Sequence, residues 1–285
     1  MKEFKDMAEV TIVSAKNRLE LGFLEVMRGI KRDIFNYRLM LKQQIRREFS
    51  SAYRDSYLGL AWKLLLPVLP VSVYVLLQYY GIFHSTSEMP RVLYIVIGFT
   101  FWSFLSSVMT NTMNRLESQS TLLRKVNVPL CVVYFSGVGQ ILFDFLVRSV
   151  FLILVLLYYN QYLSLHLLWL PVLIIPFFML SFGLGVLLSF FIIFVRDLRH
   201  IVTVLLTYGV YMSGVIFPAP EVTFLKKIFE WNPIYILIDD TRRIILGMQP
   251  LNIQFFWIWC VFALVLFVFS LHRSYLLEER VTEYL

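Results

Sequence analysis

The chain has 285 residues, of which 59% are hydrophobic and only 16% are charged, and its mean hydropathy is +0.71. Because soluble domains carry roughly 25% charged residues, this composition excludes an ordinary soluble globule. The net charge of +7 would point to nucleic acid in a soluble protein. In a membrane protein, the placement of the basic residues is the more informative property.

The segment before the first long apolar run has apolar side chains at helical spacing among basic ones. These apolar residues are Leu24, Met27, Ile34, Leu41, Ile45 and Phe49. The spacing predicts an amphipathic helix that lies in the membrane interface, within an N-terminal cytoplasmic region of residues 1–57. The alternative is a solvated basic tail that only sets the topology. We expect no removable signal peptide, because no short apolar core with a cleavage site precedes this region.

Six apolar runs follow, separated by polar joints. The runs are Leu58–Tyr80, Leu93–Met113, Leu130–Tyr158, Leu167–Phe194, Ile201–Phe217 and Ile253–Leu271. Each is near or above the roughly 20 residues that a helix needs to cross a bilayer. The runs are apolar all round instead of alternating, which favours helices over a barrel. We therefore predict an all-α integral membrane protein with six transmembrane helices in residues 58–271 and a cytoplasmic tail over 272–285.

The basic residues predict the orientation of these helices. Residues 1–63, the joints at 111–129 and 195–200, and the tail after Leu271 together hold 20 Lys and Arg. The joints at 81–92, 159–166 and 218–252 hold five, and Arg148 lies within a run. By the positive-inside rule, both termini are cytoplasmic.

Two features lie inside the predicted spans. Ser181, Gly185 and Ser189, with Gly183 beside them, form a stripe of small residues that favours close helix packing over chemistry. Asp144 and Arg148 are spaced to meet on one helix face. Charges at this depth face a bundle interior or an aqueous path, so we expect either a static structural pair or a transport-path role.

The joint at 218–252 is unusually long and apolar. Within Val222–Met248, breaks are predicted at Asn232-Pro233 and at residues 239–243, which leaves two pieces too short to span. Half-helices that re-enter the membrane from outside fit this pattern, and helices that lie on the surface fit it equally well.

The sequence offers little catalytic chemistry. It has no Walker loop, and its two cysteines and four histidines are scattered, so we expect no cofactor, metal site or redox chemistry in this chain. Asp239-Asp240 is the one hint of a metal–diphosphate site of a membrane transferase. Adjacent acids point to different faces of a helix, so a structural turn or the start of a half-helix is the favoured interpretation.

Several short motifs occur in order along the chain. They are Arg54-Asp55-Ser56-Tyr57-Leu58-Gly59-Leu60-Ala61-Trp62 followed by Pro67, then Leu123-Arg124-Lys125-Val126-Asn127-Val128-Pro129, Arg196-Asp197, Asn232-Pro233, and Arg242 or Arg243 with Gly247. This ordered set resembles the ABC-2 type permeases that export lipid-linked polysaccharides such as O-antigen, capsule and teichoic acid. The resemblance covers about residues 54–247.

The resemblance implies a permease of the bacterial inner membrane that works as a dimer with two separate ATPase subunits. ATP would be bound by the partner subunit, so this chain would be a transporter and not an enzyme. It also implies that the cytoplasmic joints contact the ATPase. The residues that carry this coupling role are Arg115, Glu117, Arg124, Lys125, Arg196, Asp197 and Arg199.

A glycan path suits aromatic side chains, because sugar C–H faces pack on rings. We select Tyr57, Trp62, Tyr74 and Trp102 from the first two spans as path residues. The lipid-linked glycan and the membrane lipids are the expected partners, without nucleic acid. The rival interpretations are an ABC-2 exporter of a lipid or drug, and a membrane glycosyl- or acyltransferase.

Overall fold

The structure is a computed structural model. It describes residues 21–53, 89–126, 128–159, 169–217, 231–250 and 253–284, and the single positions 69, 72, 73, 76, 80 and 229. Throughout this described part the regular structure is α-helical and contains no strand. The helices are α2 (Phe23–Asn36), α3 (Arg38–Tyr53), α5 (Arg91–Met113), α6 (Arg115–Ser118), α7 (Ser120–Lys125), α8 (Leu130–Ser136), α9 (Val138–Tyr158), α10 (Leu170–Phe194), α11 (Asp197–Met212), α13 (Pro233–Ile245) and α14 (Ile253–Tyr284).

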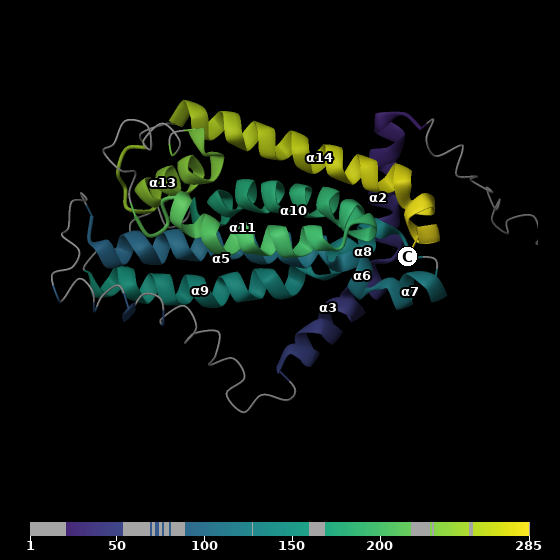
Figure 1. The fold of residues 1–285 in the computed structure, drawn as a ribbon, viewed down its shortest axis with the longest axis horizontal. Helices are drawn as coiled ribbons and strands as arrows, with labels where there is room; N and C mark the ends of the chain where they lie inside the picture. Colours follow the sequence, from purple (N-terminus) through teal and green to yellow (C-terminus); the bar gives the residue numbers. More distant parts are fainter. Residues whose placement is uncertain are drawn as a thin grey trace, which may run out of the picture.

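The long helices form a bundle. In Figure 1, α5, α9, α10, α11 and α14 run along the long axis of the molecule, with α10 in contact with α5, α11 and α14. At one end lies α13, and at the other lie α2, α3, α6 and α7, which we call the basic end. The two short helices α6 and α7 follow directly on α5, so the predicted joint at 111–129 is folded as helix.

Within the described ranges, four helical segments are long and apolar enough to cross a membrane. They are Arg91–Met113, Leu130–Tyr158, Leu170–Phe194 and Ile253–Val281. They correspond to the second, third, fourth and sixth predicted spans. The first predicted span, Leu58–Tyr80, lies almost entirely outside the described residues.

The fifth predicted span is shorter than expected. Helix α11 has 16 residues and ends at Met212, and residues 213–217 continue as turns and bends. At about 1.5 Å per residue this helix falls short of a full crossing. Gly214 has φ +64°, in the left-handed region that favours glycine, and Val215 and Ile216 are buried behind it. The helix therefore begins four residues before the predicted run Ile201–Phe217 and ends five residues before the end of that run.

The bounds of the third predicted span are confirmed, because Leu130–Tyr158 is one span-length helical segment in which the single residue Gly137, with helical φ and ψ, separates α8 from α9. A Cβ at Gly137 would overlap the side chains of Arg115 and Asn111, so only glycine fits there. The end of the sixth predicted span differs. The sixth span does not end at Leu271, since α14 continues to Tyr284. Its extension packs against α2, where Gly29 leaves room for the Tyr275 ring.

The predicted N-terminal amphipathic helix is two helices, α2 and α3, which meet at Tyr37. The buried face of α2 contains Val26, Gly29 and Ile30, whereas Leu24 is 67% exposed. Figure 1 shows α2 lying across the end of the bundle instead of along it. This crosswise direction is the one expected of an interfacial helix.

The small-residue stripe of α10 packs as predicted. A Cβ on Gly183 would lie 3.1 Å from the backbone nitrogen of Phe267 in α14, and one on Gly185 would lie 2.7 Å from Thr112 Cβ in α5. Ser189 and Tyr134 share a buried hydrogen bond of 2.6 Å between their hydroxyl groups. The stripe therefore brings α5 and α14 close to opposite sides of α10.

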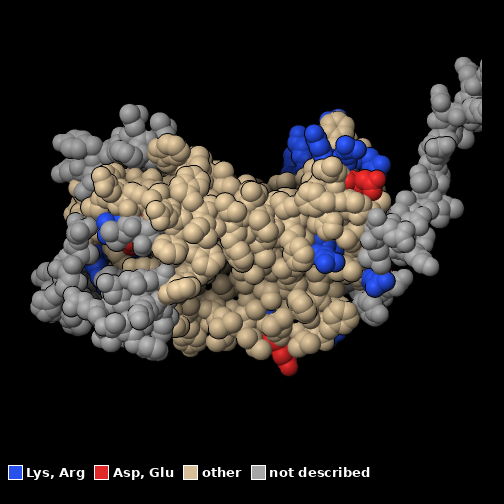
Figure 2. All heavy atoms as spheres, turned by 90° about the horizontal axis from the view of Figure 1, so that it is seen from above, with Lys and Arg blue, Asp and Glu red and all other residues tan. Residues whose placement is uncertain are grey.

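The charged side chains avoid most of the middle of the molecule. On the face that Figure 2 shows, Lys and Arg gather near the basic end, and most of the midsection is uncharged. Among the described residues, exposed basic side chains of α2 and α3 are Arg28, Lys31, Arg32, Arg38, Lys42, Arg46 and Arg47. The uncharged midsection is suited to hydrocarbon, and the basic end is suited to an anionic lipid surface.

Candidate functional site

Helix α13 begins where the sequence predicts. The Asn232 side-chain oxygen accepts hydrogen bonds from the backbone N–H groups of Ile234 and Tyr235, and Pro233 fills the first helical position. The predicted second break at residues 239–243 is wrong, because the helix runs unbroken to Ile245. The polar residues at 239–242 that suggested a break face the protein interior instead.

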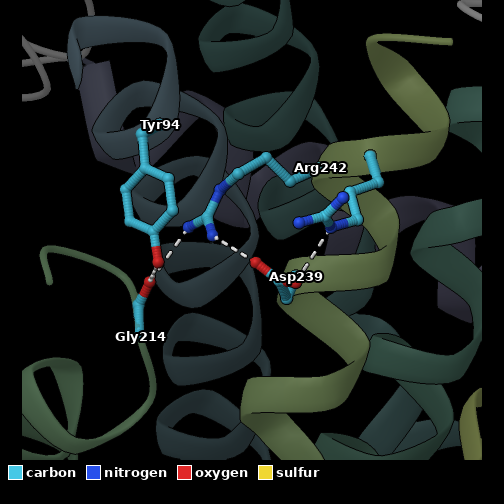
Figure 3. A network of polar contacts seen from close by, with 5 residues as sticks. Tyr94, Gly214, Asp239 and Arg242 are labelled. Atoms are coloured by element: carbon cyan, nitrogen blue, oxygen red, sulfur yellow. Dashed lines mark hydrogen bonds and ion pairs between the residues drawn. The ribbon is translucent and has the colours of Figure 1, made fainter. Parts of the chain in front are cut away.

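A buried arginine joins α13 to the rest of the bundle. The Arg242 side chain is completely buried, and it donates hydrogen bonds to Asp239 Oδ1 at 3.1 Å and to the Gly214 carbonyl oxygen at 3.0 Å. Its guanidinium lies 3.5 Å from the centre of the Tyr94 ring, and the Tyr94 hydroxyl donates to the same carbonyl at 2.8 Å (Figure 3). We call Tyr94, Gly214, Asp239 and Arg242 the arginine clamp.

The clamp explains how non-helical backbone can lie beside the long helices. The Gly214 carbonyl has left the helical ladder of α11 and accepts two hydrogen bonds from the clamp, so its polarity is satisfied inside protein. Gly98 of α5 makes room, because a Cβ there would lie 2.5 Å from an Arg242 nitrogen. The clamp therefore fixes three elements, namely α5, α13 and the end of α11.

The clamp also bears on the transferase interpretation. Asp239 accepts from Arg242 and, through its second oxygen at 3.3 Å, from Arg243 Nε, so both carboxylate oxygens already have cationic partners. Over the described ranges, no group of three or more His, Cys, Asp or Glu side chains could hold a metal ion. Asp239 thus joins α13 to the bundle, and the turn or half-helix start favoured from the sequence is wrong, because Asp239 and Asp240 lie inside an unbroken helix.

At the basic end, the structure brings two of the predicted coupling joints together. Glu117 of α6 forms an ion pair with Arg199 of α11. Beside this pair lies a cavity of about 210 Å³ between the two joints. Its lining residues are Met113, Glu117, Ser120, Arg124, Ser189, Ile192, Ile193 and Arg196.

The other predicted coupling residues divide into two groups. Arg124, Lys125, Arg196 and Asp197 are exposed at the surface. Arg115 is buried, and its guanidinium donates to Glu48 of α3 at 2.8 Å. Arg115 therefore ties α3 to α6, and its side chain faces the interior of the protein.

A polar groove of about 350 Å³ lies between α5, α9 and α11. The α5 wall is lined by Ser103, Ser106, Ser107 and Thr110, whose spacing places them on one face of the helix. Thr203 and Thr207 line the groove from α11, and Arg148 lines it from α9. The remaining lining residues are Phe99, Trp102, Leu206 and Val210.

Two residues that the sequence singled out, Trp102 and Arg148, line the groove. Trp102 is on its wall, and its ring packs against Gly209 of α11, where a Cβ would lie 2.9 Å from the indole. Arg148 lines it too, while Asp144, one turn earlier on α9, is half-buried and interacts electrostatically with Arg148. The other predicted path residues, Tyr57, Trp62 and Tyr74, lie outside the described residues.

Sequence reasoning missed the hydroxyl lining of the groove. The signal was present, since Ser103, Ser106, Ser107 and Thr110 recur at helical spacing in an otherwise apolar run. Thr203 and Thr207 repeat the pattern on α11. Single Ser and Thr residues are common in membrane helices, so only the facing of the two stripes, which is a tertiary feature, distinguishes a groove from ordinary packing.

Long apolar helices around a polar groove define a multi-pass membrane protein. The ABC-2 type transporter family matches residues 41–246, and the chain belongs to that family. It is therefore a transport protein and not an enzyme.

Curated relatives agree with this assignment. The chain is 28% identical over 187 residues to the O-antigen export system permease protein RfbA of Myxococcus xanthus, an alignment that covers 66% of this chain and 71% of the relative. It is 24% identical over 241 residues to the protein of the same name in Klebsiella pneumoniae, which covers 82% of this chain and 90% of the relative.

Replacing Arg242 with Leu should destabilise the protein far more than replacing Arg243 with Leu. The first change removes the Arg242 hydrogen bonds to Asp239 and to the Gly214 carbonyl, which keep Arg243 and the Tyr94 hydroxyl as their respective partners, and a broken buried ion pair costs about 3–5 kcal/mol. The second change keeps the Arg242–Asp239 pair. Thermal unfolding of both purified variants in detergent measures the difference, and equal melting temperatures would contradict the role of the clamp.

Proposed function

We propose that this chain is the membrane subunit of an ABC exporter that moves a lipid-linked polysaccharide, of the O-antigen, capsule or teichoic acid type, out across the bacterial inner membrane. Two copies would form the conduit, each with six transmembrane helices and both termini in the cytoplasm. Two ATPase subunits would bind and hydrolyse ATP. The names of the relatives, O-antigen export system permeases, support the cargo class.

The observation that carries the proposal is the polar groove. A hydrated glycan needs hydrogen-bonding partners while it crosses hydrocarbon, because unpaired polar groups are costly there. The groove offers six Ser and Thr hydroxyls along α5 and α11, and the Trp102 ring lies beside them. Such a lining suits a hydroxyl-rich cargo better than an apolar lipid or drug, and this is why we favour a glycan over those cargoes.

Among the described residues, nothing covers the outward side of α11, so the path needs a second wall there. Helix α11 buries only Val202 fully, and its exposed side chains include Leu205, Tyr208 and Tyr211. A second copy packed against α11 would cover these side chains and close the groove into a corridor. This arrangement supports the proposed dimer.

The basic end is the proposed docking surface for the ATPase. Arg124 and Lys125 end α7 with both side chains exposed, and Arg196 and Asp197 are exposed at the start of α11. The Glu117–Arg199 ion pair links the two joints, so a push on α6 and α7 would reach α11. We assign the contact to the four exposed residues and the transmission to the ion pair.

Removing hydroxyls from the groove should reduce export. We expect Ser106→Ala with Ser107→Ala to lower the surface polysaccharide several-fold at an unchanged protein level, because the cargo loses two hydrogen-bonding partners. The matched control is Ser181→Ala with Ser270→Ala, two hydroxyls that bond within their own helices. Quantification of surface glycan in cells that depend on the variant makes the measurement. Normal export by the groove variant would contradict the proposed path.

Reversing the charge of the basic residues of α7 should weaken the contact between this chain and the ATPase subunit. Arg124→Glu with Lys125→Glu is expected to lower co-purification of the ATPase subunit, or its stimulated turnover, by tenfold or more, because an acidic α7 repels an acidic docking site. The control is Arg273→Glu with Arg280→Glu, an equal charge change at exposed positions of α14. If both variants bind and stimulate the ATPase equally, the assigned contact is wrong.

A further inference from the structure

Arg148 is the one charged side chain among the described residues that line the polar groove. It lies near the middle of α9, within a segment long and apolar enough to span the membrane. A guanidinium at this depth is costly unless a partner or an aqueous path compensates it. Because its side chain lines a cavity, it is placed to meet whatever passes through.

The hydroxyls around Arg148 differ in what they can offer. The Thr203 and Thr207 hydroxyls each donate to a backbone carbonyl of α11 at 2.8 Å, so they present oxygen acceptors to the groove. The α5 hydroxyls, among them Ser106 and Ser107, can donate to an anion opposite. The α11 wall therefore suits the hydroxyl donors of sugars, and the α9 and α5 walls suit an anionic group.

A planar guanidinium with several N–H donors matches the oxygens of a phosphate. Asp144, one turn away, acts on Arg148 electrostatically and is not part of the groove lining. Its carboxylate weakens the attraction of Arg148 for an anion without removing it. A transport path requires sites of this kind, which bind the cargo strongly enough for it to enter and weakly enough for it to leave.

We propose that Arg148 is a transient binding site for the phosphate group that joins the lipid carrier to its cargo. The inference rests on the proposed function, since it assigns one part of the cargo to one side chain. Arg148 is then a path residue and Asp144 sets its affinity. Of the two interpretations of this pair from sequence, the transport-path role follows from the groove.

The test measures binding of geranylgeranyl diphosphate to the full chain in phosphatidylcholine nanodiscs, with geranylgeraniol as the uncharged comparison. We expect the diphosphate to bind better than the alcohol, and Arg148→Gln to weaken diphosphate binding about tenfold. Arg148→Lys should weaken diphosphate binding less, because Lys keeps the positive charge and loses only the planar set of N–H donors. Asp144→Asn should tighten it, and the exposed Arg280→Gln should leave it unchanged.

A static structural pair gives the opposite pattern. In that case Arg148→Gln alone is unstable, and Asp144→Asn with Arg148→Gln restores both stability and binding. Restored binding in the double variant, no change of affinity in Asp144→Asn, or equal binding of diphosphate and alcohol would each overturn the inference. Glycan export by the unmodified chain is scored separately, so a failure of the proposed function is distinguished from a failure of the anion site.

Discussion

The structure depends on one constraint, namely that polar groups at membrane depth must be satisfied by protein or by an aqueous path. The chain meets it in two places by different means. The arginine clamp buries Arg242 completely and uses it to satisfy a carbonyl that has left its helix. The groove keeps Arg148 and six hydroxyls open to a cavity. In the clamp, Arg242 has protein partners and holds the helices in place. In the groove, Arg148 and the hydroxyls face a cavity, where they can bind a cargo.

These two places are connected through α11. Its start is tied to α6 by the Glu117–Arg199 pair. Its end is tied to α13, where the Asn232 amide donates to the Met212 carbonyl at 3.1 Å. Between these ties α11 makes few buried contacts with the other described helices, and Trp102 against Gly209 is a close contact to α5. In contrast, α10 is held tightly between α5 and α14 by its glycines. The closely packed helices α5, α10 and α14 therefore lie beside a helix that is tied to other elements at both of its ends.

Much of this architecture could be predicted from the sequence, because hydrocarbon thickness and apolar run length determine where helices cross. The small residues of α10 likewise signalled close packing. Tertiary contacts decided the rest. Gly137 lies where Arg115 and Asn111 occupy the space of a side chain, a contact between helices that the sequence alone does not show. The aspartates of α13 looked like a helix break because charge in an apolar segment usually marks a turn, and only the fold shows that Arg242 and Arg243 pair with Asp239.

A hydrated glycan can use the polar groove only if the groove is open to water, whereas the exposed Leu154 side chain on α9 must then face lipid. The direct test places a single cysteine in a chain whose Cys131 and Cys260 are replaced by Ala, and measures labelling by a charged, water-soluble thiol reagent in native membranes. The account predicts that Ser106→Cys is labelled and that Leu154→Cys, at a site 59% exposed on α9, is not. Labelling of Leu154→Cys with protection of Ser106→Cys would contradict it.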